Sequence, residues 1–136
     1  MRLSPHFKVN GTGRAAFGRR LAWRAVFIEL ILVFLIFAIW GRVLFLYPDA
    51  VPIAASIFVV WIAVLIAILW AISNEKLWIG LIYATYCVFS IIWTFGLSSS
   101  TILTVIFELS ITAIRFAGVC GVVIWLRNRT PKRAAI

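Results

Sequence analysis

Charged residues, and acidic ones above all, are scarce in this sequence. Only 12% of its 136 residues are charged, and just four residues are acidic. Soluble domains are about half apolar and carry charge on about a quarter of their residues, whereas this chain is 65% hydrophobic with a mean hydropathy of +1.12. The composition therefore excludes a water-soluble fold and predicts an integral membrane protein.

Groups that carry catalysis or bind metals are also few. The one histidine, His6, lies near the N-terminus, and both cysteines, Cys87 and Cys120, lie inside apolar runs. So few ligands do not make a zinc or haem site, and two thiols placed in this way do not suggest a disulfide framework. The sequence has no nucleophile elbow, glycine-rich phosphate loop or H-E-x-x-H motif. We expect no metal, no cofactor and no enzymatic activity.

Four apolar runs make up most of the chain. Each has about 20 residues or more, which is the length that crosses the hydrocarbon core of a bilayer. The first run is too long for the apolar region of a signal peptide, so we expect it to be retained. The sequence predicts an all-α fold, a four-helix transmembrane bundle over 21–126, with spans at about 21–47, 51–72, 77–97 and 101–126. Basic tails are predicted at 1–20 and 127–136.

The basic residues flank these spans. Thirteen Lys and Arg against four Asp and Glu give a net charge of +9, and eleven of the thirteen lie in or beside the two tails or at Lys76. The other two connections contain none. Because segments rich in Lys and Arg stay in the cytoplasm, we expect both termini to be cytoplasmic and the protein to lie in a bacterial inner membrane. Anionic lipids are the expected partner of the basic tails, and nucleic acid is not.

Three charged residues lie well inside the predicted spans: Glu29, Glu108 and Arg115. An ionised group there costs about 2.5–3.5 kcal/mol on insertion scales, so we expect pairing, as one cluster that joins the first and fourth spans. Arg42, near a span end, is expected to snorkel to headgroups, or else to pair with Asp49 or Glu108. The cluster is interpreted as a device for helix registration, a proton relay, or a contact for a partner's charges. Since a neighbouring guanidinium favours the ionised carboxylate, Glu29 is the better candidate for a proton carrier than Glu108.

Polar side chains recur along the third span at spacings of three and four residues. Such a stripe predicts a helix face directed to the protein interior or to a small wet cavity, because hydroxyl groups in lipid need hydrogen-bond partners. Alternatively, the hydroxyls bond to carbonyls of their own helix. The stripe consists of Tyr83, Tyr86, Cys87, Ser90 and Thr94.

Small residues recur every fourth position in the second and fourth spans. They are Ala63, Ala67 and Ala71 in the second and Ala113, Ala117 and Gly121 in the fourth. Small residues allow transmembrane helices to approach closely, so we expect these two spans to pack in parallel along the two stripes. The alternative is that alanine is simply common in membrane helices.

These patterns favour an accessory, assembly or regulatory subunit that works through helix–helix contacts with another membrane protein or with further copies of itself. The alternative is a small proton-coupled transporter that works as an oligomer, with Glu29 as its titrating carboxylate. The two differ in whether changing Glu29 abolishes proton-coupled flux or complex formation.

Overall fold

The computed structural model describes residues 13–96 and 102–129, and these residues form helices joined by short turns. The elements are α1 (Arg14–Leu44), the single 3-10 turn η2 (Pro48–Ala50), α2 (Val51–Ser73), α3 (Leu77–Gly96) and α4 (Ile102–Arg127). The four α-helices are long and apolar enough to cross a membrane. The all-helical prediction with four spans is thereby confirmed, while the expected turn at 98–100 and most of both predicted tails lie outside the described residues.

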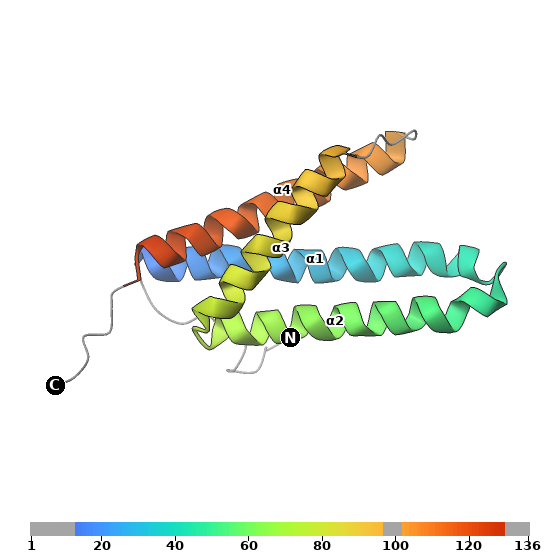
Figure 1. The fold of residues 1–136 in the computed structure, drawn as a ribbon, viewed down its shortest axis with the longest axis horizontal. Coiled ribbons are helices and arrows are strands. Elements are labelled where there is room, and N and C mark those ends of the chain that lie inside the picture. The colour runs from blue at the N-terminus through green and yellow to red at the C-terminus, as the bar shows by residue number, and fades with distance from the viewer. Residues whose placement is uncertain (1–12, 97–101, 130–136) are drawn as a thin grey trace.

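The helices form two hairpins that cross each other (Figure 1). α1 and α2 run antiparallel, α4 packs most extensively on α1, and α3 packs on α4. One end of the bundle holds the start of α1, the turn between α2 and α3, and the end of α4, and we call it the basic end. Toward the other end, the opposite end, α3 and α4 diverge from α1 and α2 (Figure 1).

The first helix begins at Arg14, seven residues before the start of the predicted span. Gly18 falls within the predicted basic tail, but it lies inside α1, where it meets Gly121 of α4. A Cβ atom added to Gly18 would lie 2.6 Å from the Gly121 carbonyl oxygen, and one added to Gly121 would lie 2.5 Å from the backbone nitrogen of Ala22. Only glycine fits at these positions, since backbone atoms cannot move aside as side chains can.

The predicted pairing of α2 with α4 is wrong. Within the described residues these two helices form no packed interface. Gly121 does allow a close approach between helices, but the helix it meets is α1. The other small residues do not form a shared interface: Ala63, Ala67 and Ala113 are exposed and Ala117 is half-buried. The spacing identified part of the close-packing face of α4, but it did not identify the partner helix, because α1 carries its own small residues at Gly18, Ala22 and Ala25.

A Schellman motif ends α2 and turns the chain into α3. The Lys76 N–H donates to the Ala71 carbonyl at 2.9 Å and the Glu75 N–H donates to the Ile72 carbonyl at 3.3 Å, which is the bonding pattern of that motif. Glu75 occupies the left-handed position, with φ of 60°. Glycine is the usual residue there, so this glutamate is held in place by something other than backbone preference.

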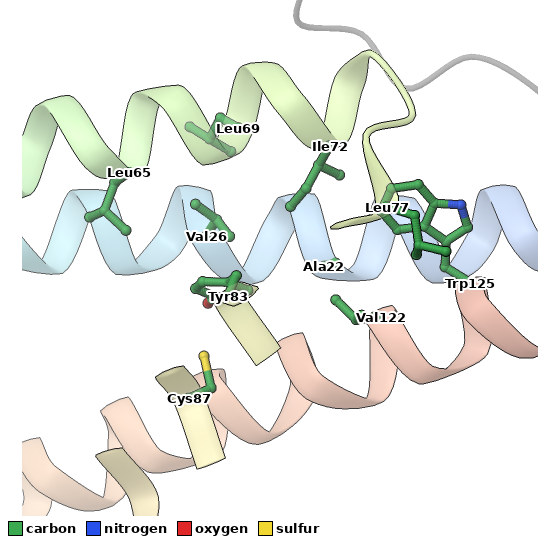
Figure 2. Close-up of a cluster of buried hydrophobic side chains, with 10 residues drawn as sticks. All are labelled: Ala22, Val26, Leu65, Leu69, Ile72, Leu77, Tyr83, Cys87, Val122 and Trp125. Carbon is green, nitrogen blue, oxygen red and sulfur yellow. The ribbon is translucent and has the colours of Figure 1, made fainter. Parts of the chain in front are cut away.

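The apolar core lies in one half of the bundle. Every buried residue that the structure describes lies toward the basic end of its helix: in α1 up to Glu29, in α2 from Leu65, in α3 up to Cys87, and in α4 from Gly118. Figure 2 shows this core, in which α2 side chains face Val26 of α1, and Leu77 of α3 and Trp125 of α4 belong to the same cluster. Its members are Ala22, Val26, Leu65, Leu69, Ile72, Leu77, Tyr83, Cys87, Val122 and Trp125. The opposite half of each helix therefore meets its surroundings rather than a core of this chain.

Candidate functional site: a buried polar cluster

An ion pair between α1 and α4 lies at the boundary between the two halves of the bundle. The Arg115 Nη2 atom is 3.0 Å from Oε1 of Glu29, and its Nε donates to the same oxygen at 3.2 Å. The Glu29 side chain is 2% exposed and that of Arg115 is 11% exposed. Two charges removed from water in this way need good geometry and further hydrogen bonds to be tolerated.

The third helix supplies those further bonds. The Tyr83 hydroxyl donates to Oε2 of Glu29 at 3.0 Å, so both carboxylate oxygens are engaged. The Tyr86 hydroxyl accepts from Arg115 Nη2 at 3.0 Å, and the Ser90 hydroxyl accepts from Nη1. We call these five side chains, Glu29, Tyr83, Tyr86, Ser90 and Arg115, the polar cluster. It links three helices through one guanidinium and one carboxylate.

The local structure that places the cluster follows from helix geometry. Residues three or four positions apart share one face of a helix, so the hydroxyl groups of Tyr83, Tyr86 and Ser90 all reach the ion pair between α1 and α4. Gly118 on α4 makes room for the first of these rings, since a Cβ atom there would lie 3.0 Å from Tyr83 and 3.3 Å from the Cβ of Ala25. The Tyr86 ring also lies beside the guanidinium, with its centroid 5.3 Å from the central carbon, at which distance a cation–π attraction adds to the pairing.

The structure brings together part of the predicted charge cluster. Glu29 and Arg115 meet as expected, but Glu108 does not join them and has no ion pair among the described residues. Seven residues of helix separate Glu108 from Arg115, about 10 Å along the axis, and the guanidinium is turned toward α1 and α3 instead. Arg42 is exposed and likewise has no ion pair within the described part of the chain.

The polar stripe of α3 divides into two kinds of residue. Tyr83, Tyr86 and Ser90 belong to the polar cluster; Tyr83 is buried, as expected for an interior face, whereas Ser90 is half-buried and Tyr86 is 36% exposed. Thr94 instead bonds to the Ser90 carbonyl of its own helix at 2.9 Å, as the alternative interpretation held. Cys87 is buried beside the cluster without forming a disulfide.

A second ion pair, at the basic end, was not predicted from the sequence. Arg19 of α1 is only 5% exposed and pairs with Glu75 in the turn between α2 and α3, while its Nη2 donates to the Ser73 carbonyl at 3.4 Å. The guanidinium carbon lies 5.9 Å from the centroid of the Trp125 ring of α4. This pair gives a reason for the left-handed glutamate, because the turn presents its carboxylate to a buried arginine. Glu75 is the one acidic residue in the tails and the turn at Lys76, and eleven of the thirteen basic residues lie in or beside these segments. That contrast in charge was the signal in the sequence that could have predicted this ion pair.

An apolar groove runs between α2 and α3 beside the polar cluster. Its volume is about 530 Å³, and its lining includes Val60, Trp61 and Val64 of α2 with Tyr83 and Tyr86 of α3. A smaller groove of about 340 Å³ lies between α1 and α2 in the opposite half. Both are nearly free of polar surface, so Tyr83 and Tyr86 line the larger groove mainly with the apolar parts of their side chains.

Within the polar cluster, the carboxylate and the guanidinium bond to each other, and each is also bonded by hydroxyl groups of α3. In the residues that the structure describes, no group of three or more His, Cys, Asp or Glu lies where it could hold a metal ion.

Comparison with known proteins gives no further guide: no protein-family model, no curated protein sequence and no solved structure matches this chain.

Proposed function

We propose that this chain is a small polytopic membrane protein that acts as an accessory, assembly or regulatory subunit through helix–helix contacts, without enzymatic activity. Two observations together support the proposal: the polar cluster joins three helices, and the apolar core lies only in the half of the bundle toward the basic end. The charges deepest in the spans serve to fasten the helices of this chain, and half of each helix remains free for contacts with other molecules.

The polar cluster supports this proposal because its groups are engaged with one another. A proton carrier must gain and lose its proton in each cycle, but the carboxylate of Glu29 lies against the Arg115 guanidinium and accepts a bond from Tyr83. The pairing with Arg115 that was expected to make Glu108 the poorer proton carrier is therefore found at Glu29 instead.

The exposed half of the bundle supports association in the membrane. Transmembrane helices associate by close packing and by interhelical polar contacts, not by burial from water. Exposed small residues, Ala63 and Ala67 on α2 and Ala113 on α4, leave surfaces on which a neighbouring helix fits closely.

The distribution of charge supports an orientation. The basic residues of the described part of the chain, apart from Arg42 and Arg115, lie at the basic end. By the positive-inside rule we place this end, with both termini, in the cytoplasm of a bacterium, and the helices in its inner membrane. Anionic headgroups are then the natural partners of the exposed basic residues at this end, such as Arg14, Arg24 and Lys76.

Purification from native membranes in a mild detergent, followed by mass spectrometry of the proteins that co-elute, tests the proposal. We expect another integral membrane protein to co-elute in a fixed ratio. An unrelated four-helix protein carrying the same tag serves as the control for detergent-driven association. Elution of this chain without any other protein, from every mild detergent tried, would contradict a subunit role.

A proton-coupled transporter is the second candidate, and the groove between α2 and α3 favours it. The groove reaches Tyr83 and Tyr86, so a substrate there would lie next to the tyrosines that bond to Glu29 and to Arg115. In proteoliposomes with an imposed pH gradient, Glu29→Gln would abolish substrate-dependent proton flux under this alternative. Glu108→Gln, which removes the same charge outside the polar cluster, would retain it. No flux above empty liposomes in the wild-type protein, with folding verified by circular dichroism, would exclude the alternative.

A further inference from the structure

Two charged side chains remain unpaired in the opposite half of the bundle. Arg42 on α1 is exposed and Glu108 on α4 is half-buried, and neither has an ion pair or a side-chain hydrogen bond among the described residues. Asp49 also lies at this end, but it follows the end of α1 in the exposed Pro48–Ala50 turn, where water can solvate it. Arg42 and Glu108 lie within helices that are long and apolar enough to cross a membrane, where an uncompensated charge is costly.

Away from the basic end, the sequence offers Glu108 only one cation besides Arg115. Arg42 is the only basic residue between Arg24 and Lys76, and Arg115 is the only one between Lys76 and Arg127. Because the guanidinium of Arg115 is engaged by Glu29 and two hydroxyls of α3, Arg42 is the cation that remains.

Within one chain these two residues do not face each other. Arg42 follows Glu29 by thirteen residues, which at 3.6 residues per turn places it about 140° around α1, away from the face that meets α4. Glu108 precedes Arg115 by seven residues and so lies on nearly the same face of α4, about 20° away. Toward the opposite end, α4 diverges from α1 (Figure 1), which leaves the Glu108 face uncovered by its own α1.

We propose that a second copy of this chain pairs its Arg42 with Glu108, so that two copies form a dimer held by two such ion pairs. In a two-fold dimer every contact is made twice, and an acid and a base on one surface are therefore self-complementary. The inference rests on the proposed membrane insertion, and it identifies one partner of the chain as the chain itself.

The depths of the two residues are compatible with this pairing. Measured from the level of the Glu29–Arg115 pair, Arg42 lies about 20 Å toward the opposite end and Glu108 about 10 Å, at 1.5 Å per residue. Side chains on a helix lean toward its N-terminus. Since α1 and α4 run in opposite directions, Arg42 leans back toward the basic end and Glu108 leans away from it. The long side chains of the two residues therefore extend toward a common depth.

Charge reversal with two differently tagged copies tests the proposal. Full-length chains with different C-terminal tags are co-expressed, and one tag is captured in mild detergent while the other is quantified. We expect wild-type copies to capture each other, and Arg42→Glu alone or Glu108→Arg alone to lower capture at least tenfold. Asp49→Arg, which makes the same change of charge at the same end, should leave capture within twofold of wild type.

Co-expression of an Arg42→Glu copy with a Glu108→Arg copy provides the sharpest test. One copy then carries two acids and the other two bases at these positions, so the mixed dimer regains both ion pairs and its capture should return to at least half the wild-type level. If both single variants capture as well as wild type, or if the mixed pair remains as weak as either variant alone, the inference is wrong.

Failure of this inference and failure of the proposed function are distinguishable. A variant that does not fold is recognised by lost helical circular dichroism, and the mixed pair still tests the pairing because it restores the charges without removing either substitution. Wild-type copies that do not capture each other but co-elute with a different membrane protein would overturn the dimer and leave the subunit role standing.

Discussion

Replacing Gly121 by alanine should separate α1 from α4. The added Cβ atom would lie 2.5 Å from the Ala22 backbone nitrogen and 2.8 Å from the Gly18 carbonyl oxygen, against ordinary contacts of 3.4–4 Å. Relief of the overlap therefore requires the helices to move apart by about 1 Å, which forfeits a quarter to a half of the dispersion energy of the atoms lining the gap. Overpacking of this kind costs about 1–3 kcal/mol.

Gly41 provides a matched control for this substitution. It also lies within a helix, but a Cβ atom added there meets nothing within 4 Å, so Gly41→Ala should be neutral or should stabilise the helix by about 0.5–1 kcal/mol. Unfolding by sodium dodecyl sulfate titrated into mild-detergent micelles, followed by tryptophan fluorescence, should separate the two variants by about 1–4 kcal/mol. If Gly121→Ala is as stable as Gly41→Ala, the close crossing of α1 and α4 is refuted.

Three further predictions follow from the contacts between helices. Tyr83→Phe removes the hydroxyl that bonds to the buried carboxylate and should lower the free energy of unfolding by about 1.5–3 kcal/mol in the same assay; an unchanged value would contradict that bond. Glu75→Ala should lower the free energy of unfolding by about 1–2 kcal/mol more than Arg19→Met does. Loss of Glu75 leaves a buried guanidinium unpaired, whereas loss of Arg19 leaves a carboxylate that water can solvate. The reverse order would count against the ion pair. Cysteines in place of Ala25 and Gly118, in a background without native cysteines, should form a disulfide on mild oxidation, since a Cβ atom added at Gly118 would lie 3.3 Å from that of Ala25. Failure to form it would place α1 and α4 elsewhere.

The helices of this fold could be predicted from the sequence because their signal is carried by composition. Apolar runs of about 20 residues or more, separated by proline, serine or charged turns, leave little freedom in where a chain crosses a bilayer. The exception is the start of α1. Gly18 and the arginines around it are typical of a tail, and it is the contact of Gly18 with Gly121 and the pairing of Arg19 with Glu75 that extend the helix to Arg14.

The partners of the site residues could be predicted only in part. The cost of a buried charge made a contact between Glu29 and Arg115 predictable, and the spacing of hydroxyls on α3 identified the face that completes the cluster. The role of Glu108 and the partner of Gly121 depended on how α4 crosses its neighbours. Periodicity along one helix shows which residues share a face, but it does not show which helix lies opposite that face, and several helices here carry suitable small residues.

A double-mutant cycle on Glu29 and Arg115 is the most direct test of the central claim, that a buried ion pair fastens α4 to α1. Glu29→Gln and Arg115→Met should each lower the free energy of unfolding in mild detergent by about 3–5 kcal/mol, since each leaves the other charge buried without its partner. The double variant should cost at least about 2 kcal/mol less than the two single losses combined. Additivity to within about 0.5 kcal/mol would show that the two residues do not interact and would contradict the account.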